Sequence, residues 1–526
     1  MIAPVVAGKP RYGGTWRTAA TATGVQWDAH TALGDGGWST LGEKVLEQHP
    51  VTGALQPNLA SSWEVADPNG LTLVFKIQAG VKIHNKPPWN GRAYTAEDIA
   101  WNIERIGGLY AERLKLPLAS FQRASMVANI VKAEAVDPLT VKVTLSKPNS
   151  GLFNGLVENR VETMPKEMDD VGYSDPLKLG GVGPFVMTEF KKDQRVLYKK
   201  HDQYFRKGEP YLDGYEVIVV PDATAVQAAF ISGQTSSLAT PTPDSVAVVR
   251  QGRKDALLYV TVDCNWQHFR LNIKGYAPFR DFRVRKGIFL ATDVTEMANG
   301  YYGDGWGYQG VLGPGFPEAW KPDKVKGIPG YSPDTKAQDI AEGQKMLAAA
   351  GYPNGKGLDF EHYISGDTSA VHFANASRFQ SQMSKVLPEM KVKLQLAGPG
   401  AEFAVRQTEG RYQMLAYTIT SVPDAGLELL SQYHSKGSRN YGGFSEPAFD
   451  SAVEKVLTEL NYQRRVELLD QMQQRWIDDW MAQYVLYAQP KKVMIPGDVG
   501  GYDKVWGIWN GYGDRAKMGR WYFVDK

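Results

Sequence analysis

The sequence predicts an α/β protein with more than one lobe, and three observations support this. The chain has 526 residues, too many for one compact core, and 43% of them are hydrophobic. A strand and a capped helix follow each other between residues 71 and 106. Between residues 332 and 396 the order is helix, strand, helix, strand, which predicts two parallel strands in one sheet.

The bulk composition excludes several classes of protein. Lys and Arg number 59 against 57 Asp and Glu, so the net charge is +2, which does not favour nucleic acid or an anionic membrane. No apolar run reaches the ~18 residues that cross a bilayer. The N-terminus lacks the basic and apolar regions of a signal peptide, so we expect a mature chain with an added Met. Cys264 is the only cysteine, so we expect a buried thiol and no internal disulfide.

The first half begins with a strand, a helix and a hairpin. Leucine, phenylalanine and isoleucine alternate between residues 71 and 77, which predicts a half-buried strand, and Asp-Pro-Asn-Gly before it predicts a turn. Thr95, Glu97 and Asp98 predict a helix start, because a Thr hydroxyl caps free N–H groups and acids favour the positive helix end. Two alternating runs around Asp137 predict a hairpin between residues 131 and 147.

The second half predicts a parallel sheet. Ser332 and Pro333 predict the start of a helix that Gly351 ends as a left-handed cap. Strands are predicted at 358–364, 392–396 and 411–419, and a helix at 370–387. Residues 421–424 follow the last strand at the carboxyl edge of the sheet, where open α/β sheets bind ligands.

Motifs for catalysis are weak in this chain. Residues 305–310 satisfy the GxGxxG pattern, but no strand precedes them and Gly-Pro-Gly follows, so we predict an aromatic loop without a nucleotide. Its Trp306 and Tyr308 are candidates to face a ligand. The eight His residues show no metal-ligand spacing on a helix, and no GxSxG elbow occurs. We therefore predict no catalytic residue, metal or cofactor.

Several segments resemble the signature of extracellular solute-binding protein family 5, whose members feed peptide, nickel and oligosaccharide ABC importers. Residues 57–64, 71–84 and 95–101 match its "P-x-LA-x-SWE", "LTFKLR-x-GVKFHDG" and "TAEDV-x-W" patterns, and residues 278–286 match "PFDDVRVRQA". The chain departs from the family at residues 84–91, where a short His-Asp-Gly turn is usual.

The resemblance implies a periplasmic-binding-protein (flytrap) fold, with two α/β lobes joined by two crossovers and an extra inserted lobe. Lobe I would comprise residues 1–50, 175–265 and 488–526. The inserted lobe II would comprise 51–174, and lobe III 266–487. Closing about the crossovers would trap the ligand.

The function implied by the resemblance is that of the substrate-binding component of an ABC importer. It would capture an oligopeptide-like solute, work with a membrane permease as a monomer, and reside in the periplasm or on a lipid anchor outside the cell. An oligosaccharide, an aromatic or carboxylate compound, or a nickel chelate is the alternative solute. A chemosensory ligand-binding module is the alternative of another class, because fold alone does not exclude it.

The candidate ligand-binding residues combine aromatic surfaces with polar groups. Peptide-binding members of the family place an Asp after the strand equivalent to 411–419, where it pairs with the peptide ammonium; here Ser421 stands there. Either Asp424 takes that role, or it is the family's structural acid and the solute is uncharged. The full set is Thr23, Trp38, Trp306, Tyr308, Tyr417, Ser421 and Asp424.

Overall fold

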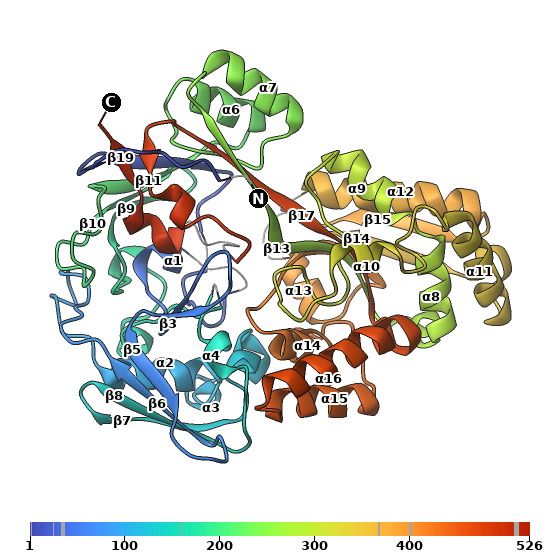
Figure 1. The fold of residues 1–526 in the computed structure, drawn as a ribbon, viewed down its shortest axis with the longest axis horizontal. Helices are drawn as coiled ribbons and strands as arrows, with labels where there is room; N and C mark the ends of the chain where they lie inside the picture. The colour runs from blue at the N-terminus through green and yellow to red at the C-terminus, as the bar shows by residue number, and fades with distance from the viewer. Residues whose placement is uncertain are drawn as a thin grey trace. The chain divides into compact units, whose positions relative to one another are not determined.

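The chain forms two compact units in the computed structural model. Unit 1 comprises Met1–Thr261 and Lys491–Lys526, and unit 2 comprises Val262–Pro490. The structure describes residues 1, 3–24, 26–32, 37–158, 160–366, 369–398, 402–509 and 515–525. The chain passes between the units twice, within strands β13 (Leu257–Leu271) and β17 (Gln483–Ile495) (Figure 1). The division into three lobes stays a prediction.

Unit 1 contains short helices and several small sheets. Its strands are β1 (Pro10–Arg11), β2 (Thr15–Ala20), β3 (Leu46–Gln48), β4 (Leu55–Pro57), β5 (Ala60–Val65), β6 (Thr72–Ile77), β7 (Ile130–Asp137), β8 (Thr140–Leu145), β9 (Phe185–Lys191), β10 (Arg195–Lys200), β11 (Gly214–Val219), β12 (Leu238–Ala239), β18 (Val499–Gly500) and β19 (Tyr522–Val524). Its helices are α1 (Trp38–Leu41), α2 (Ala96–Ile106), α3 (Ala111–Leu114), α4 (Leu152–Gly155), α5 (Met168–Val171), α6 (Ala223–Ile231) and α7 (Pro243–Gly252).

The sheets of unit 1 are separate from one another. One has the order β2-β11-β10-β9, another β5-β6-β8-β7, and the chain ends meet in β1-β19-β18. The predicted strand at 71–77, the helix after Thr95 and the hairpin at 131–147 are confirmed as β6, α2 and β7–β8. Asp98 accepts the Thr95 backbone N–H at 2.9 Å, so the predicted acid in the first turn fixes the start of α2.

Unit 2 is an α/β unit built on one mixed sheet. Its strand β14 is Asp359–Ile364, β15 is Lys391–Leu396 and β16 is Met414–Thr420. The helices are α8 (Phe282–Ala291), α9 (Val294–Tyr302), α10 (Pro322–Lys326), α11 (Lys336–Ala349), α12 (Ser369–Val386), α13 (Glu402–Thr408), α14 (Ala425–Tyr433), α15 (Pro447–Thr458) and α16 (Tyr462–Arg475).

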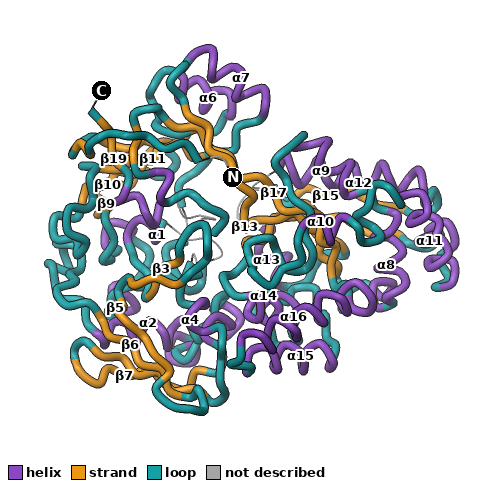
Figure 2. The backbone as a smooth tube through the Cα atoms, in the orientation of Figure 1, coloured by secondary structure: helices purple, strands orange, loops and turns teal. Residues whose placement is uncertain are grey.

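The sheet order is β12-β17-β13-β16-β14-β15, in which β12 and one end each of β13 and β17 belong to unit 1. Strand β14 pairs in parallel with both β15 and β16. The parallel pairing predicted from the helix and strand order is therefore confirmed. Helix α12 packs against β14, β15 and β16, and α14, α15 and α16 lie side by side (Figure 2). The buried core of this unit is rich in aromatic side chains, including Phe269, Phe360 and Phe379.

The predicted helix start at Ser332 is wrong, because α11 begins at Lys336. The carboxylate of Asp339 accepts hydrogen bonds from Gly330 N at 2.7 Å and Thr335 Oγ1 at 3.2 Å. These bonds hold residues 330–335 in a turn before the helix. The helix end is confirmed, since Gly351 follows it with a φ of 95°.

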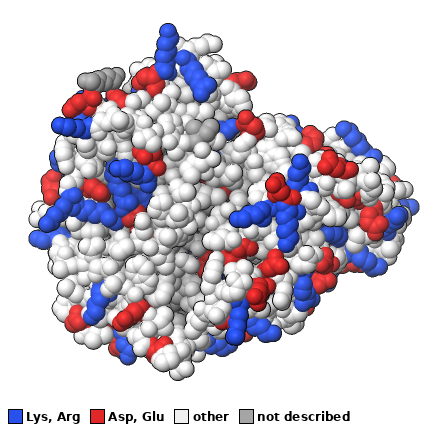
Figure 3. Space-filling model, in the orientation of Figure 1, with Lys and Arg blue, Asp and Glu red and all other residues white. Residues whose placement is uncertain are grey.

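The surface carries charges of both signs. On the face drawn in Figure 3, Lys and Arg side chains are interspersed with Asp and Glu side chains, in agreement with the small net charge.

Among the described residues, no helix has the length and apolar character needed to cross a membrane. Cys264 is buried, as predicted.

Candidate functional site

Strand β13 carries polar side chains on both faces within unit 2. Successive side chains of a strand point to opposite sides. Asp263, Asn265 and Gln267 therefore share one face, and His268 and Arg270 share the other. The neighbouring strand β16 pairs Thr418 with Gln267 and Tyr417 with His268. Burying so many polar groups is costly unless each finds a partner.

The first face holds a connected set of hydrogen bonds, which we call the amide network (Asp263, Asn265, Gln267, Thr418 and Gln489). The Gln267 amide donates to Thr418 Oγ1 and to Gln489 Oε1, each at 2.8 Å. Asp263 Oδ2 accepts from Asn265 Nδ2 at 2.7 Å and from Gln489 Nε2 at 3.4 Å. The network fixes amide and hydroxyl groups in defined directions, which favours selective hydrogen bonding to a ligand.

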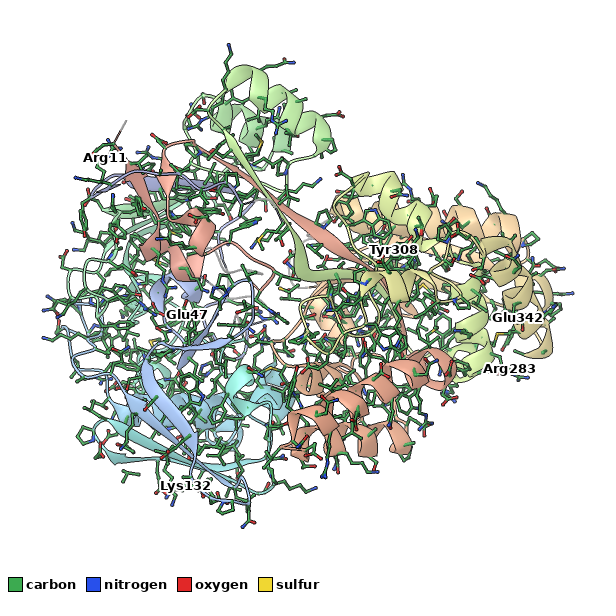
Figure 4. All side chains as sticks on the ribbon, in the orientation of Figure 1. Arg11, Glu47, Lys132, Arg283, Tyr308 and Glu342 are labelled. Atoms are coloured by element: carbon green, nitrogen blue, oxygen red, sulfur yellow. The ribbon has the colours of Figure 1, made fainter. Side chains whose placement is uncertain are left out.

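Aromatic side chains lie beside the amide network. The Tyr302 hydroxyl, at the end of α9, donates to Gln489 Oε1 at 3.5 Å. The Trp306 ring lies 4.8 Å from that of Tyr308 and 5.9 Å from that of Tyr487. Tyr308 is labelled in Figure 4 and follows Gly307, whose backbone N and O pair with Ala488 of β17. This pairing fixes the aromatic loop against the same strand that carries Gln489.

Two ionisable groups beside the network, His372 and Tyr302, are neutral at neutral pH. Burial lowers the pKa of His372 to about 4, and its Nε2 lies 2.8 Å from Thr418 Oγ1. Burial also raises the pKa of Tyr302. A neutral imidazole and neutral phenols suit hydrogen bonding and stacking.

The structure brings some of the predicted site residues together. Trp306 and Tyr308 are half-buried neighbours next to the amide network. Tyr417 and Ser421 lie on or after β16 on the opposite face, where the Tyr417 hydroxyl accepts from Arg270 Nε at 3.2 Å. Ser421 is buried, and its hydroxyl accepts from Trp266 Nε1 at 3.1 Å. Their contact with a solute stays a prediction.

Asp424 has the structural role that was one of its two predicted roles. Its carboxylate caps α14 by accepting from Leu427 N at 3.0 Å and binds Arg465 at 2.6 Å. The residue is 2% exposed. An ammonium group of a solute would have to compete with a buried guanidinium, so we leave Asp424 out of the site proposed below.

The two predicted residues of unit 1 are also packed inside it. Trp38 is fully buried, and its Nε1 donates to the Trp27 carbonyl oxygen at 2.5 Å. Thr23 is buried, and its hydroxyl bonds the side chain and backbone of Asp193. This packing does not favour the predicted stacking on Trp38 or the predicted contact with Thr23.

Sequence reasoning missed the amide network and the Arg270 side chain. A signal was present, because Asp263, Asn265 and Gln267 repeat at a spacing of two within one strand. Period-two polar residues in a central strand predict a polar surface on one of its faces.

Among the described residues, no group of three or more His, Cys, Asp or Glu side chains could hold a metal ion.

An α/β unit that presents fixed amide, hydroxyl and aromatic groups beside its sheet defines a binding protein for small polar molecules. The profile of "Bacterial extracellular solute-binding proteins, family 5 Middle" matches residues 54–440, more than half of the chain, and the protein belongs to this family.

Similar proteins share most of the length of the chain. Heme-binding protein A of Haemophilus influenzae is 26% identical over 80% of this chain and 76% of its own. The dipeptide-binding protein of Escherichia coli is 24% identical over 79% of this chain and 78% of its own. The periplasmic binding protein DppA of Helicobacter pylori, solved with the peptide STSA, has a TM-score of 0.82 at 20% identity, covering 98% of this chain and 99% of its own. The oligopeptide-binding protein AppA of Bacillus subtilis, solved with a nonapeptide, has a TM-score of 0.80 at 20% identity, covering 98% and 100%. These likenesses confirm the predicted flytrap fold.

Proposed function

We propose that this solute-binding protein captures a peptide-like solute and delivers it to the permease of an ABC importer. The amide network of unit 2 is the observation that carries this proposal. Side-chain amides offer both donors and acceptors, as the backbone of an extended peptide does, so they can pair with the peptide groups of a solute. The half-buried Tyr302, Trp306 and Tyr308 add apolar surface for its side chains.

The names of similar proteins support the same solute class. The Escherichia coli relative is a dipeptide-binding protein, and the DppA and AppA structures hold peptides. The Haemophilus influenzae relative is named for heme, so solutes differ among the similar proteins. The proposed site of action is the periplasm, or the outer surface of a cell on a lipid anchor, with a membrane permease as partner and a monomer as the working state.

A binding screen tests the proposal. The purified protein is unfolded and refolded to remove carried solute, then heated with di- to hexapeptides, oligosaccharides, aromatic acids or nickel chelates. A bound solute stabilises the native state by mass action, so we expect a raised melting temperature with peptides. A rise with oligosaccharides or aromatic acids alone, with every peptide silent, would replace the proposed solute class by the alternative one.

Substitutions locate the site once a solute is found. Asn265→Ala and Gln489→Ala, at the two half-buried amides of the network, are each expected to weaken binding by ~10-fold or more, because each removes a directed hydrogen bond of about 1–2 kcal/mol. Gln463→Ala, at an exposed position of α16, is the matched control and is expected to leave affinity unchanged. Unchanged affinity in both network variants would exclude the amide network from the site.

A further inference from the structure

The second face of β13 carries a buried positive charge. Arg270 is 2% exposed, and its guanidinium donates to three neutral oxygens: Tyr417 Oη at 3.2 Å, Gln432 Oε1 at 2.5 Å and the Gln432 carbonyl oxygen at 3.4 Å. A buried cation is normally paired with an anion, because its desolvation is costly. Arg270 has no ion pair within the part of the chain that the structure describes.

A second guanidinium lies at the end of the neighbouring strand. Arg439 donates from both terminal nitrogens to the Thr420 carbonyl oxygen, each at 3.3 Å, so its side chain lies at the carboxyl end of β16. It is 8% exposed, and no ion pair of Arg439 occurs among the described residues either. The half-buried Tyr417 lies three residues before Thr420 on the same strand.

The charges of Arg270 and Arg439 both shift the pKa values of the same two buried side chains, His268 and Tyr433. After burial itself, the charges of Arg270 and Arg439 lower the pKa of His268, so this imidazole is neutral. Both cations also lower the pKa of Tyr433, which burial raises. Glu428 also acts on Tyr433, where its charge raises the pKa, and its Oε2 accepts from Val422 N at 2.9 Å. Around Tyr433 the structure thus describes two guanidinium groups and one carboxylate, which together carry a net positive charge.

Open α/β sheets bind ligands at the carboxyl ends of their strands, where Arg439 lies. Resting on the proposed function, we propose that Arg439, Arg270 and the Tyr417 hydroxyl form a subsite for a carboxylate group of the solute. Arg270 donates to the oxygen of Tyr417, which leaves the phenol proton available to an acceptor. A guanidinium matches the planar carboxylate, and its hydrogen bonds to a charged acceptor are about twice as strong as neutral ones.

Matched peptide libraries test the subsite. Mixed-sequence di- to pentapeptides are offered with a free carboxyl terminus or with an amidated one, and binding is measured by thermal shift and, for single hits, by calorimetry. We expect the free acids to bind at least ~10-fold more tightly than the amides. Arg439→Gln is expected to abolish this difference, and Arg439→Lys to retain part of it.

Controls separate binding from stability. Arg411→Gln removes a guanidinium of the same unit that is 57% exposed and paired with Glu409, and it is expected to keep the preference for free acids. Tyr417→Phe retains the ring and is expected to reduce the preference without abolishing it. Equal binding of acids and amides by the unaltered protein, or an unchanged preference in Arg439→Gln, would overturn the subsite.

The outcomes also distinguish this inference from the proposed solute class. If both peptide libraries are silent while aromatic or sugar acids bind and their amides do not, the peptide proposal fails and the subsite stands. If uncharged oligosaccharides bind, or if no acid of any class binds, the subsite is wrong. If peptides bind regardless of their terminal charge, the peptide proposal stands without the subsite.

Discussion

Asp424 caps a helix and neutralises a buried guanidinium at the same time. We predict that Asp424→Asn lowers the free energy of unfolding by at least ~2 kcal/mol, measured by urea denaturation. Asn still caps α14, so the loss reports the charge. Removing one partner of a buried ion pair costs about 3–5 kcal/mol, and Glu318, 3.7 Å from Arg465, offsets part of this cost.

The control for Asp424 is an exposed ion pair of the same unit. Asp479 binds Arg475 at 2.9 Å with about half of each side chain exposed, so Asp479→Asn is expected to cost less than ~1 kcal/mol. Solute affinity is expected to be the same in both variants and in the unaltered protein. Loss of binding in Asp424→Asn without loss of stability would instead indicate that Asp424 pairs with an ammonium group of the solute.

Single residues show what sequence reasoning could and could not reach. The Gly-rich segment around Trp306 and Tyr308 predicts an aromatic loop, and the two rings do lie together beside the amide network. The same aromatic chemistry makes Trp38 a candidate, but its ring is buried, and nothing in its local sequence distinguishes a packed ring from an accessible one. The bond between Asp424 and Arg465 joins residues 41 positions apart, so it depends on tertiary structure that no local pattern encodes.

Helices α8 and α11 approach closely at two glycines. A Cβ added to Gly343 would lie 2.5 Å from the Gly287 carbonyl oxygen, which is backbone and cannot rotate away. Gly343→Ala is therefore expected to lower the free energy of unfolding by about 1–3 kcal/mol, although Ala favours a helix. Urea denaturation checks this.

Gly327→Ala is the matched control for Gly343. Gly327 has a φ of −78°, and the nearest atom to an added Cβ would be 3.5 Å away, so this substitution is expected to be neutral or slightly stabilising. A neutral Gly343→Ala would mean that the two helices separate at little cost. The sequence predicts the helix that Gly351 ends, whereas the need for Gly343 follows only from the neighbouring helix α8.

Strand β3 is linked to distant segments of unit 1 through Glu47, labelled in Figure 4. Its carboxylate binds Arg206 at 2.9 Å, Lys517 at 3.3 Å, and Arg520 of the 3₁₀ helix Arg515–Arg520. Burial raises the pKa of Glu47, but the Arg520 hydrogen bonds and the charges of Lys517, Arg520 and Arg206 outweigh it and lower the pKa to about 2.

The lowered pKa of Glu47 predicts a dependence of stability on pH. Above the unfolded value of 4.5 the ionised carboxylate contributes its full stabilisation, on the order of 3 kcal/mol, and this is lost as pH falls through 4.5 towards about 2. Urea midpoints measured between those pH values are expected to fall more steeply in the unaltered protein than in Glu47→Gln. Parallel pH profiles would contradict the prediction.

The whole molecule combines two compact units with two strands that pass between them. Each unit has its own buried core, which favours separate unfolding, whereas β13 and β17 belong to both and favour joint unfolding. The predicted lobe III, 266–487, comes from family motifs and its residues fall within unit 2, Val262–Pro490, while the division into lobes stays a prediction. The size of the cooperative unit does not follow from such motifs, since it depends on how strongly the two cores are coupled.

A bound solute can measure that coupling. At a concentration 100 times Kd, a solute adds about 2.7 kcal/mol to the stability of whatever unit it binds. If unit 2 unfolds by itself, this is expected to raise its melting temperature by roughly 5–10 °C, since 1 kcal/mol shifts a unit of that size by about 2–4 °C. If the whole chain unfolds together, the larger entropy of unfolding reduces the shift to roughly half. Calorimetry separates the two cases: a solute that moves one of two transitions shows independent units, and a smaller shift of a single transition shows that β13 and β17 join both cores into one cooperative unit.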